Sequence, residues 1–194
     1  MKVAIIADIH DNAHNLVLAM EKINTLGVEK VLFLGDFAGA AIAKLLCSSP
    51  VPVFGIWGNN DGDKCLITKF SLEKDSNLEV GFTVFDSIEV GGKKLFLSHY
   101  PMLGKSMAKS GDFDAVFYGH NHLKHKEMVG DCLLMNPGEI SGYKTNEPSF
   151  AVYDSETNSA EFISFSGITT NTEVSKAKFT DIKYEFNKQR GHRI

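Results

Sequence analysis

Residue types that bind metal ions recur along this chain, each at or shortly after the end of a short apolar run. They are two aspartates, one asparagine and four histidines: Asp8, His10, Asp36, Asn59, His99, His120 and His122. Carboxylate and amide oxygens favour hard cations, whereas imidazole nitrogens favour borderline ones. The set has no cysteine, which argues against a structural zinc held by thiolates. We expect two divalent ions. Mn²⁺ is the preferred candidate, with Fe, Ni²⁺ or Zn²⁺ as alternatives.

Two divalent ions in one site would activate water. Ions about 4 Å apart polarise a phosphoryl oxygen and lower the pKa of a shared water toward roughly 7, so hydroxide is available at neutral pH. A carboxylate can bridge such a pair of ions. We assign the bridge to Asp36, because it has candidate ligands before and after it in the chain.

The N-terminal half is expected to carry the first ligands to one edge of a sheet. Buried strands alternate there with helical patterns, with strands predicted at 3–7, 31–34 and 51–56 and helices at 16–26, 40–46 and 61–70. Strands separated by helices form parallel βαβ units with right-handed crossovers. Ligands bind beyond the carboxyl ends of such strands. Asp8, Asp36 and Asn59 each follow a strand within a few residues.

The C-terminal half is richer in strands. The dipeptide Gly91-Gly92 predicts a hairpin between strands at 81–90 and 93–98. Further strands are predicted at 115–118, 124–129, 132–135, 150–153 and 161–165, the last four antiparallel. An α/β half and a β-rich half together predict an α/β protein with two sheets packed face to face and helices outside. His99 and His120 also follow strands of this half.

Length, charge and cysteine content limit the classes to which this protein can belong. The chain has 194 residues and a net charge of −4, so as a whole it lacks the basic character of proteins that bind duplex nucleic acid or anionic membrane. The first apolar run is too short for a signal peptide, and no run reaches transmembrane length. The three cysteines form no CxxC pair. We therefore expect a cytoplasmic protein without disulfides.

A change of composition separates a C-terminal tail from the domain. We place the metal-binding domain at residues 1–166 and the tail at 167–194. Residues 171–194 hold six Lys or Arg against three Asp or Glu, and their apolar residues fit a helix face and an alternating strand equally well. The tail is expected to dock on the domain or on a second subunit, with a nucleic-acid arm as the alternative.

The order of the ligand set carries a family resemblance. The motifs are Asp8-x-His10, Gly35-Asp36, Gly58-Asn59-x-Asp61, His99 and Gly119-His120-x-His122. Together they closely resemble the calcineurin-like metallophosphoesterases, especially the small prokaryotic phosphodiesterase branch, over residues 1 to about 140. Asn136-Pro137-Gly138 is also similar to a turn of that branch. The resemblance implies a metallophosphoesterase fold, a four-layer α/β/β/α sandwich of two mixed sheets.

The resemblance also implies a role for each ligand. One metal would be held by Asp8, His10 and His122, the other by Asn59, His99 and His120, with Asp36 between them. The residues implied to be catalytic are Asp36, Asn59 and His99. The implied protein is a metal-dependent phosphoesterase, most directly a phosphodiesterase that hydrolyses a small or nucleotide-like phosphodiester through a bridging hydroxide. A homodimer is implied by the same resemblance.

Two residues depart from the pattern of the family. Many relatives carry histidine directly after the motif asparagine, where it can protonate the leaving oxygen; here that place is Asn60, whose amide cannot act as an acid at neutral pH. Slow turnover, or a preference for esters with good leaving groups, should follow. Glu139 stands where small-branch relatives often have serine, and we expect its carboxylate to point to solvent. Asp61 is expected to cap the helix that begins beside Asn59.

Two other functions fit the same motifs. The fold is similar to that of a retromer subunit that works through protein contacts, so a non-catalytic scaffold is one alternative. A scaffold is free to lose ligands, whereas all seven positions hold competent donors here. A two-metal phosphodiesterase can also be a nuclease, but the negative net charge argues against long duplex DNA as its substrate.

Overall fold

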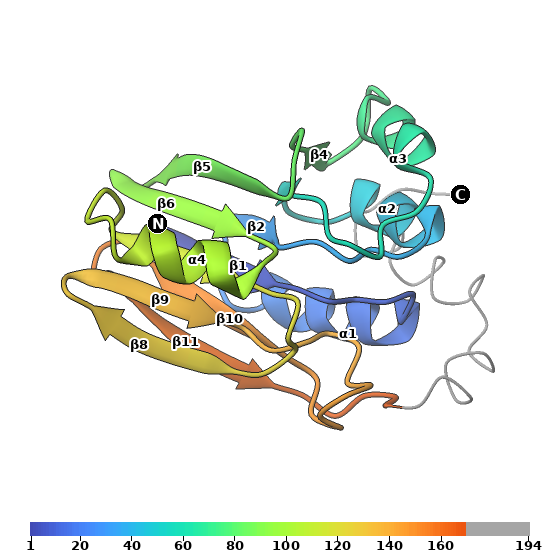
Figure 1. The fold of residues 1–194 in the computed structure, drawn as a ribbon. Coiled ribbons are helices and arrows are strands. Elements are labelled where there is room, and N and C mark those ends of the chain that lie inside the picture. The colour runs from blue at the N-terminus through green and yellow to red at the C-terminus, as the bar shows by residue number, and fades with distance from the viewer. Residues whose placement is uncertain (170–194) are drawn as a thin grey trace.

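The structure, a computed structural model, describes residues 1–169 and places helices outside two packed sheets (Figure 1). Across the first sheet the strands are β11 (Ser159–Ser164), β10 (Ser149–Asp154), β1 (Lys2–Ile6), β2 (Lys30–Phe33), β3 (Val53–Gly55) and β4 (Leu78–Val80). β1 to β4 are parallel, and β10 pairs antiparallel with β1. The carboxyl ends of β1, β2 and β3 therefore meet at one edge.

The second sheet has five strands. In order they are β5 (Phe85–Val90), β6 (Lys93–Ser98), β7 (Ala115–Tyr118), β9 (Cys132–Asn136) and β8 (His125–Val129). The central strands β6, β7 and β9 are parallel, while the edge strands β5 and β8 are antiparallel to their neighbours. The two sheets are thus both mixed, as the family resemblance implies.

The strands β1, β2 and β3 of the first sheet are buried on both faces. On β1, Ala4 and Ile6 belong to the apolar cluster under the helices, whereas Val3 and Ile5 belong to the cluster shared with the second sheet. Burial on both faces explains why the N-terminal strands are continuous apolar runs rather than alternating patterns. The core therefore consists of separate apolar layers, one between the sheets and one under each set of helices.

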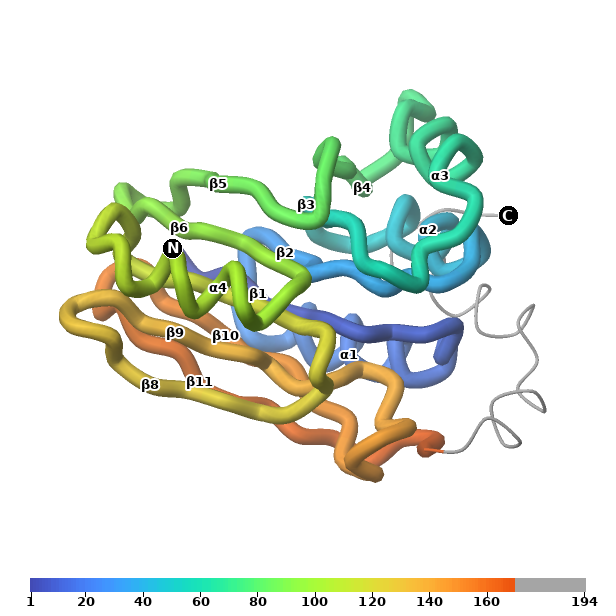
Figure 2. The backbone as a smooth tube through the Cα atoms, in the orientation of Figure 1, coloured from blue at the N-terminus to red at the C-terminus, as the bar shows by residue number. Residues whose placement is uncertain are grey.

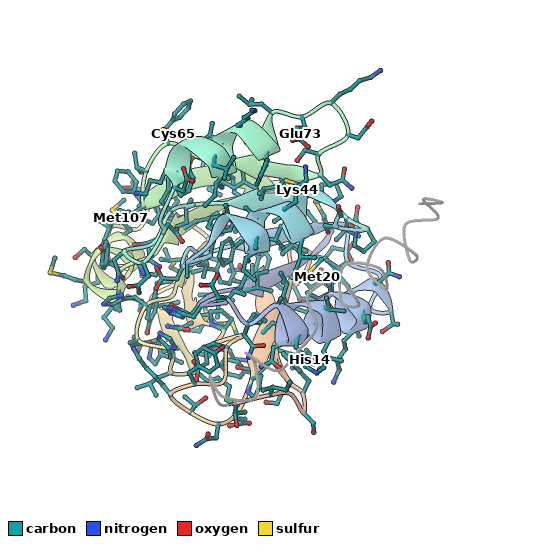
Figure 3. All side chains as sticks on the ribbon, turned by 90° about the vertical axis from the view of Figure 1, so that its right-hand side faces the viewer. His14, Met20, Lys44, Cys65, Glu73 and Met107 are labelled. Atoms are coloured by element: carbon teal, nitrogen blue, oxygen red, sulfur yellow. The ribbon has the colours of Figure 1, made fainter. Side chains whose placement is uncertain are left out.

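Within residues 1–169, four helices complete the outer layers. They are α1 (Ala13–Asn24), α2 (Ala40–Cys47) and α3 (Lys64–Ser71) beside the first sheet and α4 (Pro101–Ala108) on the second (Figure 2). α1 buries Leu16, Met20 and Ile23, as its periodicity predicts. α2 packs against α3, and the Lys44 ammonium on α2 pairs with the Glu73 carboxylate that follows α3 (Figure 3).

The structure departs from the sequence prediction in its shorter elements. α4 and β4 were not predicted, because α4 contains Gly104 in a short, weakly patterned segment and β4 has only three residues. Gly104 lets α4 approach the second sheet, since a Cβ there would lie 3.1 Å from the Cβ of Tyr118. The halves of the chain also do not correspond to the two sheets, because β10 and β11 return to the first sheet.

The end of the described chain is tied to the first helix. The Asn15 side chain accepts a hydrogen bond from the Ile168 N–H at 2.8 Å and donates one to the Ile168 carbonyl at 2.9 Å. Residues 170–194 of the predicted tail lie outside the described residues, so the boundary at 166 and the docking of the tail stay predictions. None of the three cysteines, all within residues 1–169, forms a disulfide. Across the same residues no helix has the length and apolar content to cross a membrane.

Candidate metal centre

Asp8, His10 and His122 come together at the end of β1. Their ligand atoms, one from each residue, all lie within 4.8 Å of one another. The Asp8 Oδ1 atom lies 3.8 Å from His10 Nε2 and 3.6 Å from His122 Nε2, and the two Nε2 atoms are 3.2 Å apart. Asp8 is fully buried, His122 is nearly so, and His10 is partly exposed. These three donors are the first trio.

Asn59, His99 and His120 form a second trio across the same sheet edge. The Asn59 Oδ1 atom lies 2.9 Å from His99 Nε2 and 2.7 Å from His120 Nδ1, and those two nitrogens are 3.3 Å apart. His99 is fully buried, whereas Asn59 is exposed and His120 is partly exposed. The second trio therefore reaches the surface, and a ligand can approach from its side.

Asp36 lies between the two trios. One carboxylate oxygen, Oδ2, is 3.2 Å from His10 Nε2, and the other, Oδ1, is 3.6 Å from His99 Nε2. Asp8, Asp36 and His99 also offer ligand atoms within 4.8 Å of one another. The structure thus brings all seven predicted residues to one place, with Asp36 where a bridging carboxylate would stand.

Two histidines present a nitrogen lone pair to the site. The His99 Nδ1 atom lies 2.8 Å from the Leu34 carbonyl oxygen, which can only accept, so Nδ1 carries the proton. The His122 Nδ1 atom lies 2.6 Å from the Glu139 carboxylate, which also accepts. In their neutral forms both rings therefore turn an unprotonated Nε2 toward the other donors, as metal-ligating histidines do.

The donor atoms fit divalent cations. Asp8 Oδ1 is buried and has no hydrogen-bond partner within the described residues, although two imidazole nitrogens lie 3.8 and 3.6 Å from it. A buried carboxylate oxygen without a partner is costly, and a cation shared with His10 and His122 would satisfy it. The mixture of carboxylate, amide and imidazole without thiolate suits Mn²⁺, Fe, Ni²⁺ or Zn²⁺.

Left-handed backbone is concentrated among the candidate ligands. Ten described residues other than glycine have positive φ, and five of them are Asp8, His10, Asp36, His120 and His122. Such conformations cost roughly 1–3 kcal/mol each and persist where the surrounding structure enforces them, commonly at functional sites. The loops therefore hold their donors in place at a cost in stability.

Two glycines allow the loops after β2 and β3 to touch. A Cβ on Gly58 would lie 2.1 Å from Asp36 Oδ1, and a Cβ on Gly35 would lie 2.6 Å from the Gly58 nitrogen. Gly35 also has a φ of +95°, which side chains rarely adopt. The Gly-Asp and Gly-Asn motifs are thus required by close backbone packing around Asp36.

Asp61 joins the same two loops and does not cap a helix. Its carboxylate accepts N–H groups from Gly58 at 2.6 Å and from Ala38 at 3.2 Å, while Asp63 caps α3 by accepting from the Leu66 N–H. The expectation that Asp61 caps this helix is therefore wrong. Burial outweighs these hydrogen bonds and raises the pKa of Asp61. No local sequence signal marks the contact with Ala38, because that N–H belongs to another loop.

Glu139 corrects another expectation, because its carboxylate is fully buried rather than solvated. It accepts hydrogen bonds from the His122 ring, the Ser141 hydroxyl, and the backbone and side chain of Thr145. Burial alone would raise its pKa, but the hydrogen bonds of these three residues lower it to about 2. An acidic residue between Gly138 and Ile140, in a segment that follows a buried strand, was the available signal.

Charges within the site are strongly coupled. Burial alone would lower the pKa of His10, but the hydrogen bond and charge of Asp36 and the nearby charge of Asp8 raise it from 6.5 to about 9. Burial alone would raise the pKa of Asp36, but hydrogen bonds from His10 and Asn60 hold it below its usual range. In the protein without metal, a protonated His10 thus neutralises part of the acidic charge that cations would otherwise meet.

Comparison with known proteins decides the family. Residues 1–158 match the model of the calcineurin-like phosphoesterase superfamily domain. The chain belongs to this superfamily. It is similar to a phosphodiesterase of Methanocaldococcus jannaschii, with 35% identity over 158 residues, which is 80% of this chain and 94% of that protein. It also resembles the phosphodiesterase YfcE of Escherichia coli K12, with 23% identity over 172 residues, 80% of this chain and 89% of that one.

Two solved structures share the fold. An archaeal phosphodiesterase, 32% identical, superposes with a TM-score of 0.75 over 85% of this chain and 100% of its own. A single mutant of Vps29 from Entamoeba histolytica, 19% identical, reaches a TM-score of 0.60 over 85% of this chain and 99% of its own, a likeness of fold alone. As a calcineurin-like phosphoesterase, the protein is a metal-dependent hydrolase of phosphate esters.

The charge on His10 predicts a pH dependence for the metal-free protein. Because its pKa is raised from 6.5 to about 9 in the folded chain, its stabilising effect is complete below pH 6.5 and is lost as the pH rises through about 9. We expect the Tm difference between chelator-treated wild type and His10→Asn to shrink from pH 6 to pH 9.5. A difference that stays constant or grows over this range would contradict the assigned ion pair.

Proposed function

We propose that this protein is a phosphodiesterase that uses two divalent ions to hydrolyse a small or nucleotide-like phosphodiester. Mn²⁺ is the metal we propose. The observation that carries the proposal is the convergence of two donor trios on the two oxygens of Asp36. The family and the phosphodiesterase relatives support it. Two ions held by these residues would supply a nucleophile from water near neutral pH and polarise the phosphoryl group.

Burial distinguishes the residues that would hold an ion from those that would contact substrate. The first trio lies mostly inside the protein, so it serves to hold an ion rather than to meet substrate. Asn59 and His120 face outward and are placed to contact a phosphate that approaches the site. Burial and the neighbouring His99 lower the pKa of His120, which favours the neutral ring that can act as a ligand.

Asn60 orients the bridging carboxylate instead of supplying a proton. Its backbone N–H donates to Asp36 Oδ1 and its side-chain amide donates to Asp36 Oδ2, both at 2.9 Å. Because an amide does not ionise at neutral pH, Asn60 gives no proton to a leaving oxygen. We therefore propose that the preferred substrates are diesters whose leaving groups are stable as anions.

The alternatives receive less support. A protein-contact scaffold has no use for five ligands in left-handed backbone, which is costly to maintain. A nuclease on long duplex DNA is disfavoured by the net charge of −4. We also propose a cytoplasmic location, supported by the lack of disulfides among the three cysteines. A homodimer rests on the family resemblance alone.

Removal of the bridge tests the proposal directly. Asp36→Ala is expected to lower Mn²⁺-stimulated hydrolysis of bis(p-nitrophenyl) phosphate by at least about 100-fold. Loss of a residue that only hydrogen-bonds to a metal ligand already lowers metal affinity or activity about 10–100-fold. Asp112→Ala, at an exposed aspartate away from the site, is the matched control and should keep full activity. A protein shown to bind two ions that hydrolyses neither diesters nor monoesters would contradict the proposal.

A proton donor restored at position 60 should widen the range of substrates. For Asn60→His we expect kcat to rise at least about 10-fold for an alkyl phosphodiester relative to a p-nitrophenyl diester, since general acids contribute about 10²–10⁴-fold where protonation is needed. Asn60→Gln, which cannot donate a proton as an acid, separates this gain from the lost contact with Asp36. Equal ratios of the two rates in both variants would refute the assignment.

A further inference from the structure

The two trios differ in what stands behind their buried histidines. His122 of the first trio donates its Nδ1 proton to the Glu139 carboxylate at 2.6 Å, whereas His99 of the second trio donates to the neutral Leu34 carbonyl at 2.8 Å. A carboxylate partner fixes the ring and makes the opposite nitrogen a stronger ligand than a carbonyl does. The centre is therefore built with unequal halves.

The Glu139 carboxylate is itself fixed in place. Its Oε2 atom accepts from His122 and from the Ser141 hydroxyl. Its Oε1 atom accepts the backbone N–H of Lys144 at 3.0 Å, and both the N–H and the hydroxyl of Thr145 at 2.8 Å. Five donors to a fully buried side chain leave it no freedom to turn away from the His122 ring.

The remaining geometry of the segment also serves the first trio. The Ser141 N–H donates to the Asp8 carbonyl at 3.1 Å, and the Ile140 N–H donates to the Ala7 carbonyl at 3.0 Å. Residues 139–141 thus contact both the backbone that carries Asp8 and the ring of His122. Neither contact reaches Asn59 or His120 of the second trio.

We propose that Glu139 is a positioning residue for His122 and makes the site of Asp8, His10 and His122 the tighter of the two metal sites. The inference rests on the proposed two-metal function but concerns binding rather than hydrolysis. It predicts stepwise loading, with the buried first trio occupied before the exposed second trio. Loss of such an outer-shell partner typically weakens metal binding about 10–100-fold.

Calorimetric titration of Mn²⁺ into chelator-stripped protein tests the proposal. Wild type should show a tight and a weak binding phase. Glu139→Gln, which keeps the shape and removes the charge, should weaken the tight phase about 10–100-fold and leave the weak phase unchanged. Glu147→Gln is the matched control, because Glu147 is an exposed glutamate of the same loop that pairs with Lys124. Unchanged phases in Glu139→Gln, or equal weakening of both, would overturn the proposal.

A measurement on the wild type guards against a variant that fails to fold. Nitrogen-15 NMR of the histidine rings in metal-free protein should show His122 with its proton on Nδ1, and titration with diamagnetic Zn²⁺ should shift its signals before those of His120. An Nε2-protonated His122, or a shift of His120 first, would overturn the proposal. If two ions bind in this order and no diester is hydrolysed, the proposed function fails while the inference about Glu139 stands.

Discussion

The buried carboxylate of Asp36 is the group on which the other parts of the site depend. Only 1% of its surface is exposed, and a buried charge is tolerated only when partners compensate it. Its partners come from three loops: the ring of His10, both N–H groups of Asn60, and the ring of His99 across the sheet interface. Position 58 requires glycine, because no side chain fits beside this carboxylate. The positions of the neighbouring donors follow from its burial.

Parallel strands are what make this arrangement possible. β1, β2 and β3 of the first sheet and β6 and β7 of the second all end at the same side of the sandwich, and each end carries a donor or a glycine that makes room for one. The rigid core sits behind these ends, so the left-handed turns of Asp8, His10 and Asp36 are held by packed strands. The stability of this large core thus offsets the free-energy cost of the left-handed backbone at the site.

The sequence predicted the part of the site that follows from strand order. The convergence of the seven candidate residues, with Asp36 between the two trios, and the two-sheet fold could be predicted, because donor residues after apolar runs combine with the parallel topology to bring them to one edge. Glu139 and Asp61 were misjudged for a common reason. For each of them, one deciding partner is brought close only by tertiary folding: the Ala38 N–H for Asp61 and the His122 ring for Glu139. The short α4 and β4 could not be predicted from the sequence, because they contain too few residues for a periodic pattern.

Anomalous X-ray diffraction from crystals soaked in Mn²⁺ tests the central claim most directly. The account predicts two anomalous peaks about 3.5–4 Å apart. One should lie among Asp8, His10 and His122, the other among Asn59, His99 and His120, with Asp36 touching both. A single peak, or two peaks that do not share Asp36, would contradict the account.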